Sequence, residues 1–171
     1  PGCGRWCVRI EYAGRLVTFL EPASFRRPPA AIRVPFQRPD QMPLASFTID
    51  GITGRCGVDT GARSSLIINS PFVDANHLSE RYGASFESIT GWGIGGPVRS
   101  RLARIGAMRV GQVSAMHGIV ARLSTQKRGS LTSSSFDGLI GGELLRRFTV
   151  TFYFSRSVML LEPDECIGKS E

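Results

Sequence analysis

The amino-acid sequence predicts a single, mainly β globular domain. The chain has 171 residues, of which 42% are hydrophobic and 20% charged, and this is enough apolar material for one packed core. Its 20 glycines and 10 prolines favour a turn-rich β architecture over a helical bundle. Several segments also alternate apolar and polar residues, which is the pattern of a strand with one face in a core.

Composition excludes several classes of protein. The net charge of +7 raises the question of nucleic acid. However, the arginines are scattered, no basic block is interleaved with aromatic residues, and no zinc-finger or RNA-recognition signature occurs. We therefore predict solvated surface arginines and no nucleic-acid partner. No apolar run approaches the roughly 18 residues of a membrane-spanning helix, so no membrane span is expected in this chain.

The beginning of the chain and its cysteines leave the cellular compartment open. The opening PGCGRW lacks a Met and a signal peptide, and we expect that an upstream segment was removed; a periplasmic or secreted location is favoured. The four cysteines have no metal-ligand spacing, and His77 and His117 belong to no clustered ligand set, so we predict no metal and no cofactor. Cys3 or Cys7 could pair with Cys166, whereas Cys56 is expected to be a small buried hydrophobic residue.

The first segment is a predicted hairpin that has a counterpart near the end of the chain. Residues 8–22 (VRIEYAGRLVTFLEP) alternate around an Ala-Gly turn, and residues 150–163 (VTFYFSRSVMLLEP) are similar. The aligned residues are Val8, Ile10 and Tyr12 with Val150, Phe152 and Phe154. Either two hairpins resemble each other by chance, or residues 1–22 are the tail of an earlier, similar lobe that has been removed.

A Pro-rich connector and then the main series of strands follow. Residues 23–43 are too rich in proline for a central strand or a helix, and we expect an extended connector with one short edge strand at 32–36. Residues 44–163 are predicted to form the lobe and 164–171 a tail. The lobe opens with a hairpin that turns at Asp50-Gly51 and ends its second strand at Asp59.

The remaining elements follow from similar patterns. A strand is predicted at 64–69, and a helix at 70–83 that is capped by Ser70 with Pro71 at its first position. Strands at 107–110 and 115–121 precede a polar loop at 122–135. A short apolar strand, a Gly-Gly turn and a helix at 143–148 lead into the closing strands.

Glycines surround Trp92 at the tip of another predicted hairpin. Four of them occupy positions 91, 93, 95 and 96. A phosphate-binding loop does not fit, because no Gly-Lys-Ser/Thr follows and no helix begins there. A dinucleotide fingerprint does not fit either, since the flanking residues alternate as strands and no βαβ unit is present. We predict a mobile hairpin tip.

Three motifs, in order, resemble a single lobe of the aspartic proteases. They are VDTGA at 58–62, GWGIGG at 91–96 and LIGGELLRRF at 139–148, and the match spans about residues 44–163. The chain is most similar to the retropepsin-like, bacterial single-lobe or tandem-lobe kind. This resemblance implies a closed, barrel-like β fold with a flap hairpin and one or two short helices.

The resemblance also implies roles for individual residues. Asp59 matches the catalytic aspartate, and the active-site loop continues through Thr60, Gly61 and Ala62. The flap tip, which closes over a bound peptide, matches Trp92, Gly93, Ile94 and Gly95. The strand beneath the catalytic loop matches Leu139, Ile140 and Gly141. Arg63 and the bulky Trp92 depart from the usual pattern, and both bear on substrate preference and activity.

The chemistry of peptide hydrolysis explains why one aspartate is not enough. Without a metal, Ser or Cys, a water must be activated while the carbonyl is polarised, and two carboxylates that share one proton do both. The chain has one Asp-Thr-Gly and no Asp-Ser-Gly, and Asp137 precedes an apolar strand instead of ending one. The sequence therefore predicts an aspartic endopeptidase of peptide or protein substrates whose second Asp comes from a homodimer mate or an upstream lobe.

Two other classes remain open. The first is an inactive lobe of the same fold that holds an extended peptide by β-addition. The second is a structural β domain in which VDTG is only a turn.

Overall fold

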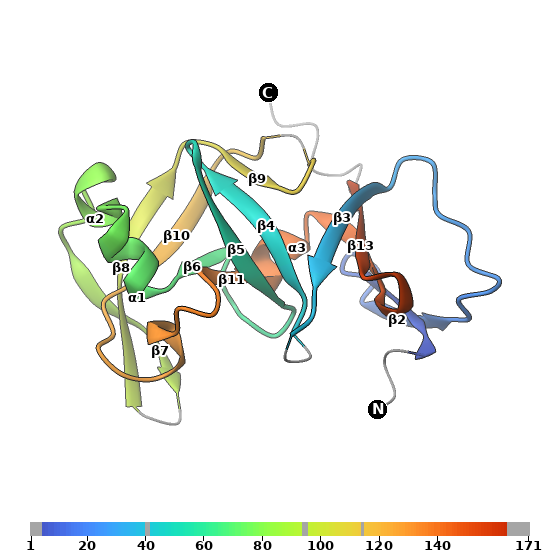
Figure 1. Cartoon of the computed structure of the whole chain (residues 1–171), viewed down its shortest axis with the longest axis horizontal. Coiled ribbons are helices and arrows are strands. Elements are labelled where there is room, and N and C mark those ends of the chain that lie inside the picture. The colour runs from blue at the N-terminus through green and yellow to red at the C-terminus, as the bar shows by residue number, and fades with distance from the viewer. Residues whose placement is uncertain (1–4, 40–41, 94–95, 114, 164–171) are drawn as a thin grey trace.

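A computed structural model describes residues 5–39, 42–93, 96–113 and 115–163 (Figure 1). The described residues form a mainly β protein, as the sequence predicts. The strands are β1 Cys7–Glu11, β2 Leu16–Leu20, β3 Ile32–Gln37, β4 Leu44–Ile49, β5 Ile52–Asp59, β6 Leu66–Ile68, β7 Glu87–Gly93, β8 Gly96–Ile105, β9 Met108–Val110, β10 Ile119–Ser124, β11 Gly138–Gly141, β12 Phe148–Tyr153 and β13 Val158–Pro163. The α-helices are α1 Ser70–Ala75, α2 Leu78–Arg81 and α3 Gly142–Leu145.

These strands belong to one mixed sheet that does not close. Their order is β2-β1-β12-β13-β3-β4-β5-β11-β6-β10-β8-β7, and β9 pairs with β4. The expectation of a closed barrel is therefore wrong. The sheet stays open because a hairpin stands at each end of it, β1–β2 beyond β12 and β7–β8 beyond β10, and no described strand joins β2 to β7.

The curved sheet encloses one large core and a smaller one. Fully buried side chains of the large core come from strands along the middle of the sheet path and from α3, and they include Phe47, Leu66, Ile119, Ile140 and Leu144. The smaller core consists of Cys7, Ala31, Tyr153, Val158 and Leu160. It lies where the first hairpin meets β12 and β13, so residues 5–22 pack as part of the same body as the lobe.

β3 is an internal strand of the sheet, which corrects the expectation of an edge strand. It lies between β13 and β4. The Phe36 N–H donates to Ser157 O at 3.0 Å, so the neighbouring position, Pro35, is directed toward β4, whose pairing begins only at Phe36. The missing N–H of Pro35 therefore costs the sheet no hydrogen bond, and proline is tolerated in an internal strand.

The segment 70–83 forms two short helices instead of one. The break falls at Asn76 and His77, and His77 has a left-handed backbone with φ of 49°. The predicted cap is also displaced by one residue: Asn69 is the N-cap, and the Ser70 hydroxyl instead donates to Gln126 O at 2.7 Å. With α3, the described residues have three α-helices instead of the one or two expected.

Two boundaries near the C-terminal half also differ from the expectation. The strand predicted at 115–121 is β10, which begins at Ile119 and continues through Ser124 into the region predicted as a loop. Arg122 and Leu123 join it because β6 and β8 pair with them from both sides. The last helix covers Gly142–Leu145 instead of 143–148, since Phe148 already begins β12.

Both predicted hairpins are confirmed, as β1–β2 and β12–β13. They are joined to each other, because β1 pairs with β12 along five residues. Cys7 and Cys56 are buried and unpaired, and burial strongly raises the pKa of the Cys56 thiol. Cys3 and Cys166 lie outside the described residues, and so does the disulfide predicted with Cys166.

The described residues include no helix that is long and apolar enough to cross a membrane. No three His, Cys, Asp or Glu side chains in the described ranges are grouped so that they could hold a metal ion.

The β4–β5 turn is held by the carboxylate of Asp50. It accepts hydrogen bonds from the Tyr82 hydroxyl at 2.8 Å and from the N–H groups of Ala107 at 2.7 Å and Gly106 at 3.0 Å. Partial burial raises the pKa of Asp50, but these three donors together with the charge of Arg81 outweigh burial and hold the pKa below its ordinary value. The turn is thus tied to the ends of α2 and β8.

We expect Asp50→Asn to lower the free energy of unfolding by about 1–3 kcal/mol at neutral pH, because the donors lose a charged acceptor. Since the folded-state pKa is depressed, the stabilisation is present above the ordinary pKa near 4 and is lost as pH falls through the depressed value. Urea unfolding from pH 7 to pH 2 measures both effects. The exposed Asp74→Asn is the control, and an unchanged pH dependence in Asp50→Asn would contradict the assignment.

Candidate active site

Asp59 is the last residue of β5 and is delivered to the surface by the β4–β5 hairpin. The hairpin turns at Asp50 and Gly51, both of which have positive φ, 43° and 89°. The preceding residues of β5, Cys56 to Val58, are buried, whereas Asp59 is half-buried. A buried strand thus ends in a carboxylate that solvent can reach.

The loop after Asp59 holds this carboxylate from one side. The Gly61 N–H donates to Asp59 Oδ1 at 2.9 Å, and the Ala62 N–H donates to the Asp59 carbonyl oxygen at 3.3 Å. Thr60 and Gly61 are exposed. The bend therefore orients the carboxylate with backbone groups and leaves Thr60 exposed.

β11 lies beside this loop and contains the predicted supporting residues Leu139, Ile140 and Gly141. It runs parallel to β5 and antiparallel to β6, with Gly141 directly beside Asp59. The Gly141 N–H donates to Ser65 O at 3.1 Å, and the Gly142 N–H donates to Ala62 O at 2.9 Å. The two sides of the Asp59 loop are therefore bonded to the end of one short strand.

Gly141 allows this close approach because it has no side chain. A Cβ at this position would lie 2.1 Å from the backbone oxygen of Ser64 and 2.9 Å from that of Ala62. Both distances are shorter than any van der Waals contact between such atoms. The path of the Asp59 loop over β11 thus requires glycine here.

Asp137 is far from Asp59, in agreement with its exclusion as the second acid. Its Oδ2 accepts the Arg55 N–H at 2.7 Å, at the opposite end of the β5–β11 pair. Four residues separate Asp137 from Gly141, which corresponds to about 13 Å along a strand. Asp137 closes the entry to β11 and does not contribute to the site.

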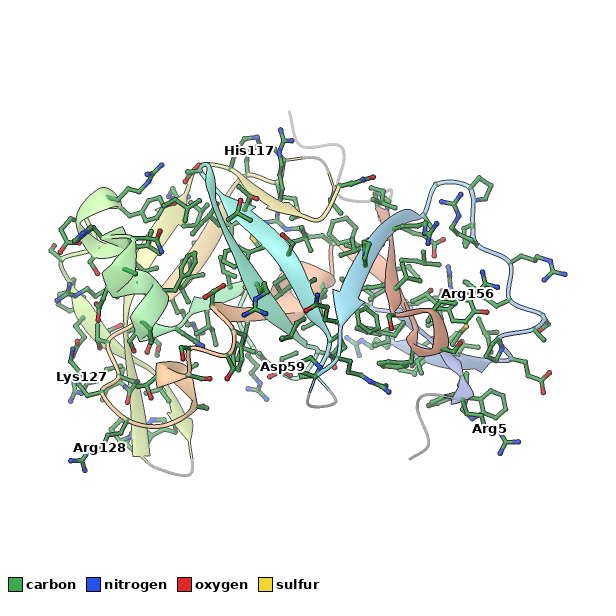
Figure 2. The ribbon with its side chains drawn as sticks, viewed as in Figure 1. Arg5, Asp59, His117, Lys127, Arg128 and Arg156 are labelled. Atoms are coloured by element: carbon green, nitrogen blue, oxygen red, sulfur yellow. The ribbon has the colours of Figure 1, made fainter. Side chains whose placement is uncertain are left out.

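The glycine-rich hairpin is present as β7–β8. Trp92 pairs with Pro97 and Gly93 with Gly96, and 77% of the Trp92 side-chain surface is exposed. Ile94 and Gly95 lie outside the described residues. In Figure 2, Asp59 lies at the lower edge of the molecule, and Figure 1 shows the β7–β8 hairpin reaching the same edge. No contact joins Trp92 to Asp59 in the described residues, so a flap role stays a prediction.

Arg122 connects the hairpin to the Asp59 loop, a role that no pattern in the sequence indicates. Its Nη1 donates to Thr90 O in β7 at 2.6 Å, and its Nη2 reaches Arg63 O at 3.4 Å. The sequence predicts a polar loop at this position, where an arginine suggests only solvation. Recognising it would have required the pairing of β10 with both β6 and β8, which depends on contacts distant in sequence.

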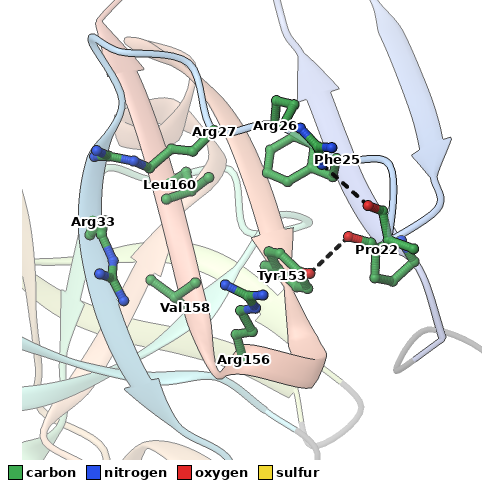
Figure 3. A pocket seen from close by; sticks show the side chains of 10 residues that line it. Pro22, Phe25, Arg26, Arg27, Arg33, Tyr153, Arg156, Val158 and Leu160 are labelled. Carbon is green, nitrogen blue, oxygen red and sulfur yellow. Dashed lines mark hydrogen bonds between the residues drawn. The ribbon is translucent and has the colours of Figure 1, made fainter.

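A surface depression of about 370 Å³ lies elsewhere, at the first hairpin. It is lined by apolar residues of β13, the Phe25 and Tyr153 rings, and four arginines (Figure 3); the arginines are Arg26, Arg27, Arg33 and Arg156. The two rings meet edge to face at 5.7 Å. This depression does not include Asp59, and all four arginines are exposed.

We expect Gly141→Ala to lower the free energy of unfolding by about 1–3 kcal/mol or to prevent folding, because the new methyl group overlaps the Ser64 carbonyl oxygen. Gly91→Ala is the matched control, since a Cβ there meets no atom within 4 Å. Chemical denaturation of both variants measures the difference. Equal stability of the two variants would contradict the close packing of the loop on β11.

We expect Arg122→Met to increase hydrogen exchange at the base of the β7–β8 hairpin and to cost about 1–2 kcal/mol of stability. The methionine keeps the apolar stem but removes both donors to backbone oxygens. Arg104→Met is the control, because Arg104 is exposed on the neighbouring strand β8. Faster exchange in both variants alike would show that Arg122 has no special connection to the hairpin.

Comparisons with known proteins agree with this geometry at the level of the fold. No protein-family model matches the sequence, and no curated protein is similar to it in sequence. The structure is similar to a retropepsin-like aspartic protease from Rickettsia conorii, with a TM-score of 0.50 and 18% identity over 77% of this chain and 89% of that one. It also matches Basic 7S globulin from soybean, with a TM-score of 0.47 and 11% identity over 92% of this chain and 50% of that one. The described chain has the fold of a retropepsin-like aspartic protease lobe.

Proposed function

We propose that this chain is one lobe of an aspartic endopeptidase. Asp59 would be one of two catalytic carboxylates, and the substrate would be a peptide or protein. The observation that carries the proposal is the position of Asp59: it ends a buried strand, accepts the Gly61 N–H and remains open to solvent. A carboxylate that serves only a turn has no need of a strand such as β11 packed beneath it.

The chemistry follows from the shared proton. The ionised carboxylate of the pair removes a proton from a water molecule, which attacks the peptide carbonyl carbon. The protonated carboxylate donates its proton to the carbonyl oxygen, and this gives a neutral tetrahedral intermediate. The N–H of Gly61 holds one oxygen of Asp59 in place during these steps, so that the other oxygen is free for the water.

The second carboxylate must come from outside the described lobe. Asp137 is occupied at the far end of β5, and the Asp-Thr-Gly at 59–61 is the single such motif in the sequence. A homodimer mate or an upstream lobe would supply the other aspartate. The exposed Thr60 is available to bond such a partner.

A second candidate function is an inactive lobe that binds extended peptides. It is favoured by the absence of a second acid near Asp59 among the described residues. The strands of β7 and β8, with Trp92 exposed, would then hold a peptide by strand addition without cleaving it. This lobe would bind peptide equally well with Asp59 or with Asn at that position.

We expect Asp59→Asn and Asp59→Ala to lower peptide cleavage by the assembled protein by about a thousandfold, because neither side chain can accept the proton of the water. Asp74→Asn, in an exposed position of α1, is the matched control. Turnover of a fluorogenic peptide library measures the loss. Cleavage that survives both substitutions unaltered would remove Asp59 from the mechanism, and binding without cleavage in every variant would support the inactive lobe.

A further inference from the structure

The two hairpins of this chain are copies of one structure. The pair Glu11 and Leu16 closes the turn of the first hairpin. The pair Tyr153 and Val158 closes the turn of the second, and each of its residues lies 142 positions after its equivalent in the first. Every pair of β1–β2 recurs at the same offset in β12–β13, from Cys7↔Leu20 to Glu11↔Leu16. The sequence similarity between residues 8–22 and 150–163 therefore corresponds to an identical strand register.

The turns also match residue by residue. The Arg15 N–H donates to Tyr12 O at 3.2 Å, and the Ser157 N–H donates to Phe154 O at 3.1 Å. Arg15 and Ser157 both have a left-handed backbone, with φ of 53° and 49°. Positive φ is uncommon outside glycine, so its recurrence at equivalent positions argues against chance similarity.

A local two-fold axis relates the hairpins. Arg9 pairs with Thr151, and these two residues are equivalent to each other under the offset of 142. An axis through this pair exchanges β1 with β12 and β2 with β13. The first hairpin therefore has the position relative to β12–β13 that is expected for the closing hairpin of a second, symmetry-related lobe.

One set of side chains is buried in the second hairpin, whereas its equivalents in the first hairpin are only partly covered. In the second hairpin, Val150, Phe152, Met159 and Leu161 lie on one face and are at most 5% exposed in the large core. The equivalent face of the first hairpin carries Val8, Ile10, Val17 and Phe19. Val17 is 51% exposed and Phe19 59% exposed. These four residues are the apolar quartet. Val8 and Ile10 are half-buried, and Ile10 packs against the large core, whereas Val17 and Phe19 are uncovered in the described structure.

The strand edge shows the same difference. β3 covers the outer edge of β13, with Val158 to Leu161 paired to Ile32 to Pro35, and the Phe36 N–H bonded to Ser157 O. The outer edge of β2 is bare, because β2 ends the sheet in the described chain. In an antiparallel pair, every second residue directs its backbone N–H and C=O away from the partner strand. Val17 and Phe19 are equivalent to Met159 and Leu161, the residues of β13 that bond to β3. Their N–H groups therefore point away from β1, toward the bare edge.

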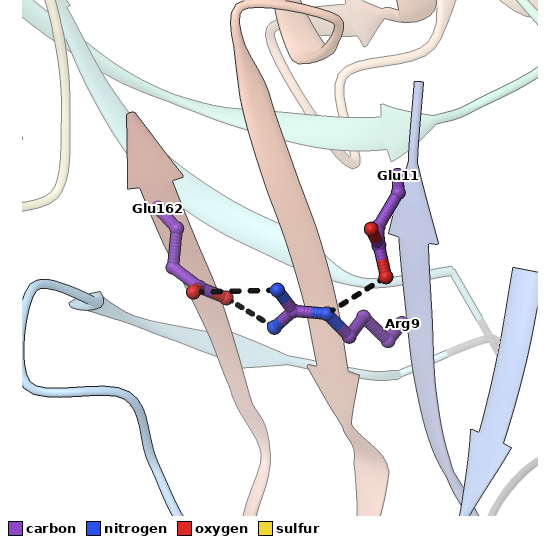
Figure 4. Close-up of polar contacts among 3 residues, drawn as sticks. All are labelled: Arg9, Glu11 and Glu162. Carbon is purple, nitrogen blue, oxygen red and sulfur yellow. Dashed lines mark hydrogen bonds and ion pairs between the residues drawn. The ribbon is translucent and has the colours of Figure 1, made fainter. Parts of the chain in front are cut away.

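A charged contact holds the first hairpin in this position. Arg9 Nη1 lies 2.5 Å from Glu162 Oε1 of β13, and Arg9 Nε lies 3.2 Å from Glu11 Oε1 (Figure 4). Arg9 reaches across β12 to make the first contact, and its side chain is only 23% exposed. The hairpin is thus bonded to this lobe through both backbone and side chains.

We propose that β2 and the apolar quartet dock a second lobe of the same fold, which precedes the first hairpin in the same polypeptide. That lobe would add a strand to residues 16–19 as β3 does to β13, and would bury Val17 and Phe19, the exposed half of the quartet, in its own core. A second copy of this chain is a poorer occupant, because its β3, the strand that would have to be added, is already paired with its own β13 and β4. This inference rests on the proposed function in that the same lobe would carry the second acid.

The experiment compares hydrogen exchange in two polypeptides, the chain Pro1–Glu171 and the encoded polypeptide extended upstream. Both carry Asp59→Asn, so the result does not depend on cleavage. The amides of Val17 and Phe19 are expected to exchange at least about 100-fold more slowly in the extended polypeptide. The amides of Met159 and Leu161 are the internal reference, and they should be protected in both.

Two variants of the extended polypeptide sharpen the result. Val17→Pro removes an outward N–H of β2 and should abolish the added protection at Phe19, while Val17→Thr keeps the N–H and should preserve it. Equal exchange in both polypeptides would overturn the proposal. Protection that instead appears in Pro1–Glu171 with rising concentration would also overturn it, in favour of a second copy. Failure of the proposed function is distinguishable from failure of this docking proposal, because it would appear as peptide cleavage that survives Asp59→Asn and not as a change in hydrogen exchange.

Discussion

The close contact between β11 and the Asp59 loop is the constraint on which the rest of the site depends. β11 is inserted between β5 and β6, which are neighbours in sequence, so the loop that joins them must pass over its end. The contact of Gly141 with Ser64 and Ala62 leaves no room for a side chain, and two backbone hydrogen bonds close it. A carboxylate placed on such a loop keeps its orientation even though solvent reaches it, because backbone groups and not side chains define its position.

Parts of this arrangement could be predicted from the sequence, and they are the parts that local chemistry determines. The hairpin that ends at Asp59 follows from alternation and from an Asp-Gly turn, and both terminal hairpins follow from alternation alone. The internal position of β3 could not be predicted, because proline suggests an edge unless the one-sided pairing at Pro35 is known. The role of Arg122 could not be predicted for a similar reason, because its partners, Thr90 and Arg63, are distant in sequence. The expectation of a closed barrel came from the resemblance and not from the residues. It is wrong because the hairpins β1–β2 and β7–β8 stand at the two ends of the sheet and are not joined.

The exposure of the site is consistent with half of a larger centre. Thr60, Gly61 and Arg63 are exposed around Asp59, and Trp92 is exposed on β7–β8. A catalytic group that needs no partner is best buried among its own hydrogen-bond donors. In a centre that two lobes share, each half is exposed to solvent until the other half covers it. Desolvation after assembly would then strengthen the interaction between the two carboxylates and their shared proton.

The duplication of the hairpin bears on how that second half could arrive. A symmetric pair of these chains that reproduced the junction between the two hairpins would have to bring β12 of each chain against the other, but this edge is already occupied by β1 over five residue pairs and by Arg9 on Glu162. Displacing the hairpin would expose Cys7 and the smaller core that it shares with Val158 and Leu160. A preceding lobe avoids this cost, since the hairpin is then its own closing element and its pairing with β12 is the junction between lobes. The strand register of a single hairpin thus favours two lobes in one polypeptide over two identical chains.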